Sequence, residues 1–232
     1  MKKKPPPHIL DLVAEEREQR SQAIRATLPT LQHAEGRAIA CGDSCAWCCH
    51  IKLITDLLDG MVAFRWLLKQ GRWTSGLRLA LLKADAELCR FTHAECLKML
   101  LPCVFLDHGA SQASTTGKCS IYPARPLACG VTFAYLPGQE LCGRVGGKAS
   151  FQAVPNTPDQ YELSRRAIKQ YGLKPEYMSF PGAVLTAEAD HLGRSRPDIA
   201  RVTLVGDGLS TRHVDELFDQ NVLALRDTIE EP

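Results

Sequence analysis

The sequence lacks the features that define several large classes of protein. No run approaches the 18 consecutive apolar residues of a transmembrane helix, so we expect no membrane span. The N-terminus, MKKKPPP, leads into acidic residues where a secretory signal has its apolar segment, which predicts a cytoplasmic protein. A formal net charge of +2 provides no strongly basic face for nucleic acid. Internal repeats and a regular alternation of strands and helices are also missing.

Cysteine, by contrast, is abundant, with 10 among 232 residues. The segment CGDSCAWCC holds Cys41, Cys45, Cys48 and Cys49. Thiolates this crowded repel one another unless a cation neutralises them or they are oxidised. In a helix, positions i, i+4 and i+7 share one face, so Cys41, Cys45 and Cys48 would form one stripe. Three sulfurs are three-quarters of a tetrahedral metal site or of a cubane iron–sulfur cluster, so the segment predicts metal binding.

A disulfide framework is the competing explanation for so many cysteines. Such frameworks are typical of short secreted domains that follow a signal peptide. Because we expect a cytoplasmic protein, we expect reduced thiols, and reduced clustered thiols collect metal ions.

The hydrophobic pattern predicts a mainly α fold, with helices around an irregular cysteine-rich metal-binding core and at most a small β-hairpin. Helices are expected at 8–28, 54–71, 76–100, 158–171 and 211–228, the first ending before Pro29 and the third being the longest. A short strand is expected at 201–205. The region 102–150 is rich in Gly, Pro and Cys, and its β-prone pieces CVFL and CSIY predict the hairpin.

The chain is long enough to bury a core of its own. We expect an N-terminal tail and helix at 1–37 and a cysteine-cluster metal-binding domain at 38–150. Residues 151–232 would form a C-terminal helical extension packed on the same domain. The Lys2–Lys4 run is interpreted as a solvated tail that could touch an acidic protein partner.

The pattern CxxxCxxC with an aromatic residue, Trp47, before its last cysteine is similar to the radical S-adenosylmethionine signature. Enzymes with that signature build the site on a β/α barrel, which this sequence does not predict. Cys49 is also foreign to the signature, so radical chemistry is not the favoured interpretation.

Four segments together resemble another family. Cys41–Cys49 is followed by HIKLI, then by PCVFLDHG, then by GKCSIYPARPLACG and a further cysteine. This order, over about residues 38–145, resembles the CxxCxxCC (YkgJ-type) cysteine-cluster family, whose members are described as zinc- or iron-chelating. The eponymous pattern has two residues between its first two cysteines, whereas this chain has three between Cys41 and Cys45. Some members are flagellin lysine methylases, but those chains are longer.

The resemblance implies a set of eight metal-ligating cysteines: Cys41, Cys45, Cys48, Cys49, Cys103, Cys119, Cys129 and Cys142. Tyr122 and Arg125 lie between the cysteines of C-x-I-Y-x-x-R-P-x-x-C, the most specific element. We expect them to anchor this loop beside the cofactor, with the guanidinium bonded to carbonyls or a carboxylate. No residue is assigned a catalytic role.

The identity of the metal stays open between iron–sulfur and zinc. Zinc sites usually combine two CxxC knuckles, whereas only Cys45–Cys48 has that spacing here. A tight stripe of three cysteines with a remote fourth suits an iron–sulfur cubane somewhat better. Adjacent side chains such as Cys48 and Cys49 point in different directions, which suggests two centres, with one centre as the alternative.

Three classes of function follow from these features: a metal-handling or redox module, a protein-modifying enzyme such as a lysine N-methylase, and a structural metal site that supports an interaction surface.

Cys89, His93 and Cys96 would share one helical face and could hold a further ion, although a core position is the favoured interpretation. His50 and His108 adjoin cluster segments and are interpreted as outer residues rather than ligands.

Overall fold

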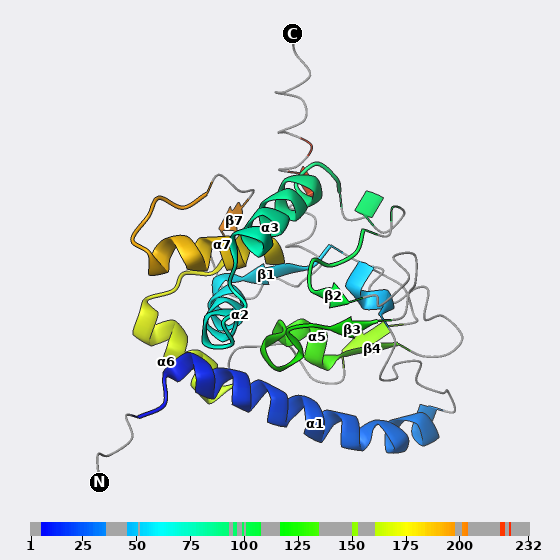
Figure 1. Cartoon of the computed structure of the whole chain (residues 1–232). Coiled ribbons are helices and arrows are strands. Elements are labelled where there is room, and N and C mark those ends of the chain that lie inside the picture. Colours follow the sequence, from blue (N-terminus) through cyan, green and yellow to red (C-terminus); the bar gives the residue numbers. More distant parts are fainter. Residues whose placement is uncertain are drawn as a thin grey trace.

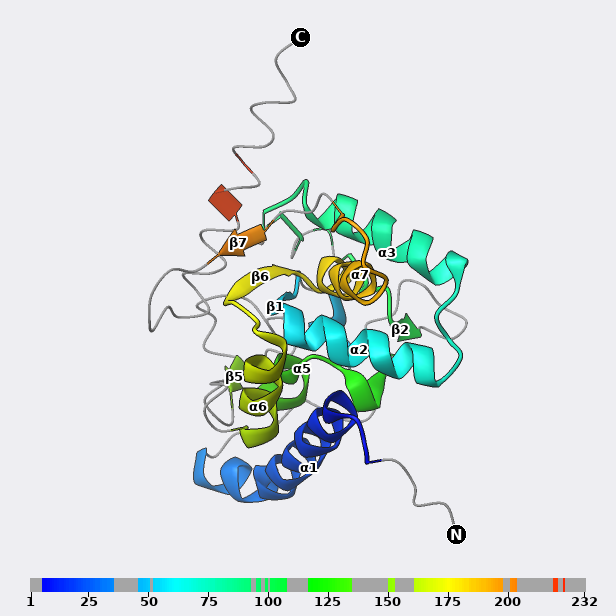
Figure 2. The same cartoon turned by 90° about the vertical axis from the view of Figure 1, so that its left-hand side faces the viewer.

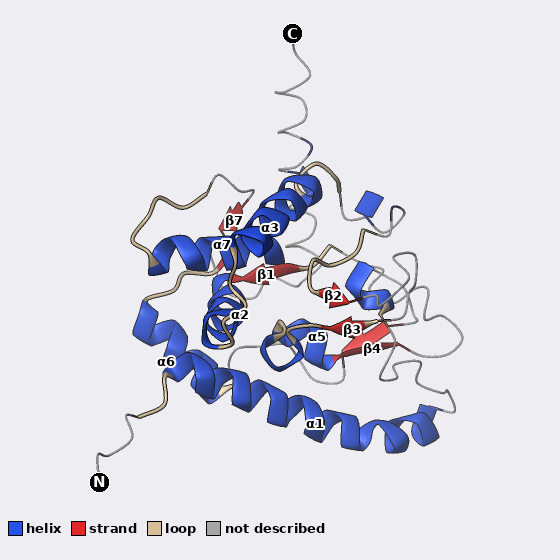
Figure 3. Ribbon diagram, in the orientation of Figure 1, coloured by secondary structure: helices blue, strands red, loops and turns tan. Residues whose placement is uncertain are grey.

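The computed structural model describes residues 6–35, 46–50, 52–92, 95–96, 99, 101–107, 117–134, 150–152, 161–197, 201–203, 219–220 and 223. Six α-helices lie in this part of the chain: α1 (Ile9–Glu35), α2 (Leu57–Lys69), α3 (Ser75–Leu88), α5 (Leu127–Val131), α6 (Glu162–Tyr171) and α7 (Phe180–His191). Two 3₁₀ turns, η1 (Trp47–His50) and η2 (Tyr122–Ala124), interrupt the loops. The expected mainly helical fold is confirmed (Figure 1; Figure 3).

The short strands form three antiparallel sheets. β1 (Ile54–Asp56), β6 (Glu176–Ser179) and β7 (Arg201–Thr203) make one sheet with β6 in the middle. β2 (Leu106–Asp107) pairs with β3 (Lys118–Cys119), and β4 (Thr132–Ala134) pairs with β5 (Ser150–Gln152). The strand expected at 201–205 is therefore present as β7. The hairpin expected from CVFL and CSIY is present as β2 and β3.

Helices α2 and α7 form the centre of the molecule, where they cross beneath α3 (Figure 2). Helix α2 starts at Asp56, whose carboxylate accepts the Asp59 N–H at 2.9 Å and so caps the helix. Ten of the twelve residues of α7 are buried. A Cβ at Gly60 would overlap the carbonyl of Ala183, so the close approach of the two helices requires glycine there.

Helix α1 lies along one side of the molecule and packs on α2, α5 and α6 (Figure 1). Its buried positions recur at helical spacing and are Ile9, Leu10, Val13, Arg17, Ser21, Ile24 and Leu28. Two of these positions carry polar side chains, Arg17 and Ser21, and both face the cysteine-rich loops. No helix among the described residues is long and apolar enough to cross a membrane.

The predicted end of the first helix is wrong. Helix α1 continues past Pro29 to Glu35, because a proline removes one backbone donor without stopping a helix whose other bonds are kept. The same helix, with 27 residues, is the longest in the described part of the chain, rather than the one predicted at 76–100.

The helix predicted at 76–100 ends early, at Leu88. The buried ammonium of Lys52 donates to the carbonyl of Phe91 at 2.6 Å, a tertiary contact that sequence periodicity does not reveal. The helix predicted at 54–71 starts three residues late because Ile54 belongs to β1. Most of the helix predicted at 211–228 lies outside the described residues, although Asp219, Gln220 and Leu223 are helical.

Candidate metal centre

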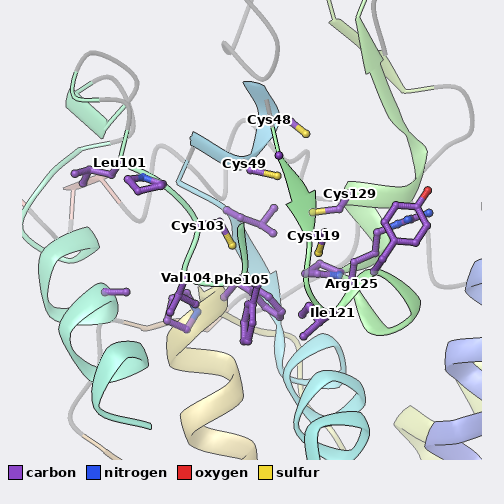
Figure 4. A pocket seen from close by; sticks show the side chains of 18 of the residues that line it. Cys48, Cys49, Leu101, Cys103, Val104, Phe105, Cys119, Ile121, Arg125 and Cys129 are labelled. Atoms are coloured by element: carbon purple, nitrogen blue, oxygen red, sulfur yellow. The ribbon is translucent and has the colours of Figure 1, made fainter. Parts of the chain in front are cut away.

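Five cysteines line one cavity with a volume of about 520 Å³. Cys48 and Cys49 come from η1, Cys103 from the loop before β2, Cys119 from β3 and Cys129 from α5. Figure 4 shows their sulfur atoms around this cavity, above the side chains of Val104, Phe105 and Ile121. The other three family-pattern cysteines, Cys41, Cys45 and Cys142, lie outside the described residues.

The backbone holds the first two cysteine segments side by side. The N–H of Cys103 donates to the carbonyl of Cys49 at 2.6 Å. Within η1, the N–H of Cys49 bonds to the carbonyl of Ala46 at 2.9 Å. His50 Nδ1 lies 3.0 Å from the same carbonyl, and this histidine is buried beside the cavity rather than in its lining.

Cys103 and Cys119 share a local geometry. The thiol of each accepts a hydrogen bond from the backbone two residues later, from Phe105 in one case and from Ile121 in the other. The β2–β3 hairpin sets these two loops together by pairing Leu106 with Cys119. Backbone donors aimed at sulfur favour the thiolate, the form that binds metal. Gly117 permits this pairing, since a Cβ there would lie 2.7 Å from the carbonyl oxygen of Asp107.

Helix α1 supports the loop that carries Cys129. The hydroxyl of Ser21 donates to the carbonyl of Gly130 at 2.9 Å and accepts from Nη2 of Arg125 at 2.6 Å. Arg17 binds the carboxylate of Asp59, which also accepts the N–H of Leu127 at 3.4 Å. The start and the end of α5 are thus both tied to side chains from distant helices.

Arg125 and Tyr122 lie together at the edge of the cavity. The guanidinium carbon of Arg125 is 3.5 Å from the centre of the Tyr122 ring, and Nη2 is 3.4 Å from the carboxylate of Glu18. Arg125 is buried, whereas Tyr122 is 39% exposed and forms part of the rim. The charge of Arg125 also lowers the pKa of Cys119, in opposition to the larger effect of burial.

The thiols hold their protons tightly in the absence of a cation. Burial raises the pKa of Cys103 to about 12 and raises that of Cys129 well above its usual value. A hydrogen bond with Cys48, followed by burial, raises the pKa of Cys49. Cys48 contributes to the raised pKa of Cys49, Cys103, Cys119 and Cys129, so the five thiols interact electrostatically. A metal ion binding here would therefore displace protons.

The charged lining of the cavity is mainly positive. Among the described lining residues, Arg25, Lys118 and Arg125 are cationic and only Glu87 is anionic. Cationic side chains around a thiol-rich cavity compensate the negative charge that several thiolates would carry. Within the described ranges, no three Cys, His, Asp or Glu side chains are arranged so that they could hold a metal ion by themselves. The donor chemistry and the charge of the lining fit a metal centre.

Cys89 and Cys96 do not line this cavity. Cys89 caps the end of α3, and its thiol lies 3.7 Å from the carboxylate of Asp85. Cys96 is fully buried, 4.0 Å from the carbonyl of Phe91. His93 and His108 lie outside the described residues.

Sequence reasoning missed the supporting residues of α1 and α2, namely Arg17, Glu18, Ser21 and Asp59. They are far from the cysteines in sequence, so no spacing connects them. One signal was present: Arg17 and Ser21 occupy the apolar stripe of their helix, and polar residues in such a stripe need partners.

One family model matches the chain over residues 40–156, and its description reads "CxxCxxCC: Putative zinc- or iron-chelating domain". The matched range contains all five cysteines of the cavity as well as Cys41, Cys45 and Cys142. No curated protein and no solved structure matches the chain.

Proposed function

This chain belongs to the CxxCxxCC family of zinc- or iron-chelating domains, and we propose that it holds an iron–sulfur cluster in its five-cysteine cavity. The observation that carries the proposal is the gathering of Cys48, Cys49, Cys103, Cys119 and Cys129 around one buried space. A cubane cluster takes four thiolates, and Cys41, Cys45 and Cys142 are proposed to complete the ligand set together with these five.

Each part of the chain has a separate role in this proposal. The cysteines would supply thiolates, and backbone N–H groups of Phe105 and Ile121 would stabilise two of them. Arg25, Lys118 and Arg125 would balance the negative charge of the centre. A bound cluster would supply one-electron chemistry or a store of iron. We therefore propose a metal-handling or redox module in the cytoplasm.

Zinc is the second candidate, because the same thiols suit it and the family description includes it. A zinc centre would make the site structural. It would then hold the loops between Cys48 and Cys129 in place for contact with a protein partner.

Metal analysis of anaerobically purified protein separates these functions. Protein from iron-replete cells is expected to be brown, with iron and acid-labile sulfide. A colourless preparation with stoichiometric zinc would assign the site to zinc. Folded protein without metal, but with reducible disulfides, would contradict both.

Single cysteine variants test the ligand set. Cys129→Ser is expected to lose metal, whereas Cys89→Ser, a cysteine of similar exposure outside the cavity, is expected to keep it. A comparison of Cys48→Ser with Cys49→Ser addresses the number of centres. Two centres require each variant to keep part of its metal with a different spectrum, whereas one centre allows full occupancy in one variant and total loss in the other.

A further inference from the structure

A second cavity, with a volume of about 610 Å³, lies where the ends of α6 and α7 approach the start of α1. Helix α2 and the start of β6 complete its walls. It shares no lining residue with the cysteine cavity. Nothing in the proposed metal chemistry uses it.

The floor of this cavity is apolar. Leu10, Leu57, Phe64 and Ala187 line it and are buried, and Met61 lies among them. The side chain of Leu68 also lines the cavity and is 41% exposed, so apolar surface continues to the mouth. A pocket of this size and lining is typical of sites for small organic ligands.

Two arginines with paired carboxylates contribute polar parts of the lining. Arg196 binds Asp190 through Nε and Nη2, both at 2.8 Å, and binds Glu176 through Nη1 at 2.9 Å. Each of its three nitrogens donates one of these bonds, and two carboxylates face this single positive charge. Arg65 binds Asp11 through Nε at 3.1 Å and through Nη2 at 3.2 Å.

Unused positive charge remains on one side. Nη1 of Arg65 makes no hydrogen bond within the described part of the chain, although its guanidinium is fixed in direction by Asp11. Lys174 also lines the cavity, and it forms no ion pair with any described residue. A guanidinium held by one carboxylate keeps donors for a second anion.

Two other polar side chains of the lining carry no charge at pH 7. His8 and Tyr171 lie 3.3 Å apart, between Nε2 and the phenol oxygen. Burial and then the charge of Arg65 lower the pKa of His8, and burial raises the pKa of Tyr171. These two side chains offer hydrogen bonds without adding charge, so the preference for an anion comes from Nη1 of Arg65 and the ammonium of Lys174.

We propose that this cavity binds a small organic anion, a monocarboxylate with an apolar chain or ring. The apolar body would lie on Met61 and Phe64, and the carboxylate would face Nη1 of Arg65 and the ammonium of Lys174. This site is independent of the metal centre, so its test does not depend on which metal the protein holds.

Methionine-methyl NMR with sodium octanoate tests the proposal in the full-length, metal-loaded protein. Of the three methionines in the described ranges, Met61 lines the cavity, Met178 is fully buried and Met99 is exposed elsewhere. Octanoate is expected to shift the Met61 methyl signal in a saturable way and to leave the Met99 signal unchanged. 1-Octanol has the same chain without the charge and is expected to bind about tenfold more weakly, the effect of one charge-assisted hydrogen bond.

Three variants and a matched control test which side chains interact with the carboxylate of octanoate. Arg65→Gln is expected to weaken octanoate binding about tenfold and Lys174→Gln about threefold, because the lysine is exposed. Leu68→Glu places a carboxylate at the mouth and is expected to repel octanoate without disturbing the fold. The control is Lys83→Gln, an exposed lysine of α3 outside both cavities, and it should bind as the parent does.

Two results would overturn the proposal. No shift of the Met61 signal up to the solubility limit of octanoate would show that the cavity is not a ligand site. Equal or tighter binding of 1-octanol or octylamine would show that the cavity does not select an anion. The parent spectrum, in which Met178 reports the folded core, distinguishes either result from unfolding.

Discussion

The helical half of the molecule and the cysteine half are stabilised in different ways. In the helical half, α2, α3 and α7 bury apolar side chains against one another, and ten of the twelve residues of α7 are inaccessible. In the cysteine half, α5 has five residues, β2 and β3 have two each, and hydrogen bonds from Ser21 and Asp59 hold the loops. Apolar burial dominates in the first half, whereas the second half depends more on polar contacts and on the charge that neutralises its thiols.

Removal of the metal should produce the largest difference in stability between the two halves. Binding free energy in a cysteine site is largely folding free energy, on the order of 10 kcal/mol for structural zinc. Hydrogen exchange after chelation is expected to show lost protection over 101–107 and 117–131, with little change in α2 and α7. Unchanged protection over those two ranges would mean that the ligands lie elsewhere.

A substitution that removes buried apolar volume from the helical half should lower the stability of the fold without changing metal binding. Leu185 is 1% exposed in α7, and Leu185→Ala is expected to lower the free energy of unfolding by about 3 kcal/mol. Metal content per folded molecule should not change, because α7 contributes no thiol. Urea unfolding together with metal analysis checks both expectations. Loss of metal from a variant that is still fully folded would show that the two halves are not stabilised independently.

The support from α1 can be tested with two buried serines. Ser21→Ala removes the hydroxyl that donates to the carbonyl of Gly130 and accepts from Arg125, which leaves Glu18 as the ion-pair partner of that guanidinium, at a cost of about 2 kcal/mol. Release of metal to a competing chelator should also become faster, because both ends of this contact position the Cys129 loop.

Ser164→Ala is the matched control. Ser164 is as buried as Ser21, but its hydroxyl makes no hydrogen bond, so its removal should be neutral or slightly stabilising. Equal effects of the two substitutions would indicate that Ser21 acts only through packing.

The smallest effect concerns the pH dependence of the contact between β1 and α2. Burial and then the charge of Asp59 raise the pKa of Asp56 from 3.8 to about 6. The folded state therefore binds this proton more tightly than the unfolded state, and the resulting stability is lost as the pH rises through 6. The free energy of unfolding is expected to fall by about 1 kcal/mol from this group between pH 5 and pH 7.

Asp56→Asn removes this titration and keeps an oxygen that can cap α2. Its unfolding free energy should therefore depend less on pH than that of the parent over the same interval. A parallel pH dependence in both proteins would assign the proton to another group.

The sequence predicted the helical class because α2 and α6 carry one apolar face each, which appears as a 3.6-residue period. It did not predict α7, since FPGAVLTAEADH is buried on nearly all sides and has no contrast between faces. The start of that helix is marked by Ser179, which caps Gly182, and by Pro181 in the first turn. These two residues are local signals of a helix start that do not depend on an apolar face.

The candidate site likewise has one part that the sequence predicts and another part that it does not. Its cysteines were recognisable from the sequence because their spacing is dense and because the family pattern includes them. Their grouping in space could not be predicted, since it depends on the β2–β3 pairing and on the bond between Cys103 and Cys49. The contacts of Ser21 and Asp59 join residues more than 60 positions apart, and sequence spacing carries no information on such pairs.

The spread of the cysteine cavity along the chain has a consequence for its biosynthesis. Its first described cysteines are Cys48 and Cys49, and its lining ends with Phe180 and Pro181, the first residues of α7. At ordinary rates of translation, Cys48 and Cys49 leave the ribosome on the order of ten seconds before the last wall of the cavity exists. During that interval the nascent chain presents vicinal thiols to oxidants and stray metal ions, so correct loading of the finished site requires that they stay reduced until synthesis has passed α7.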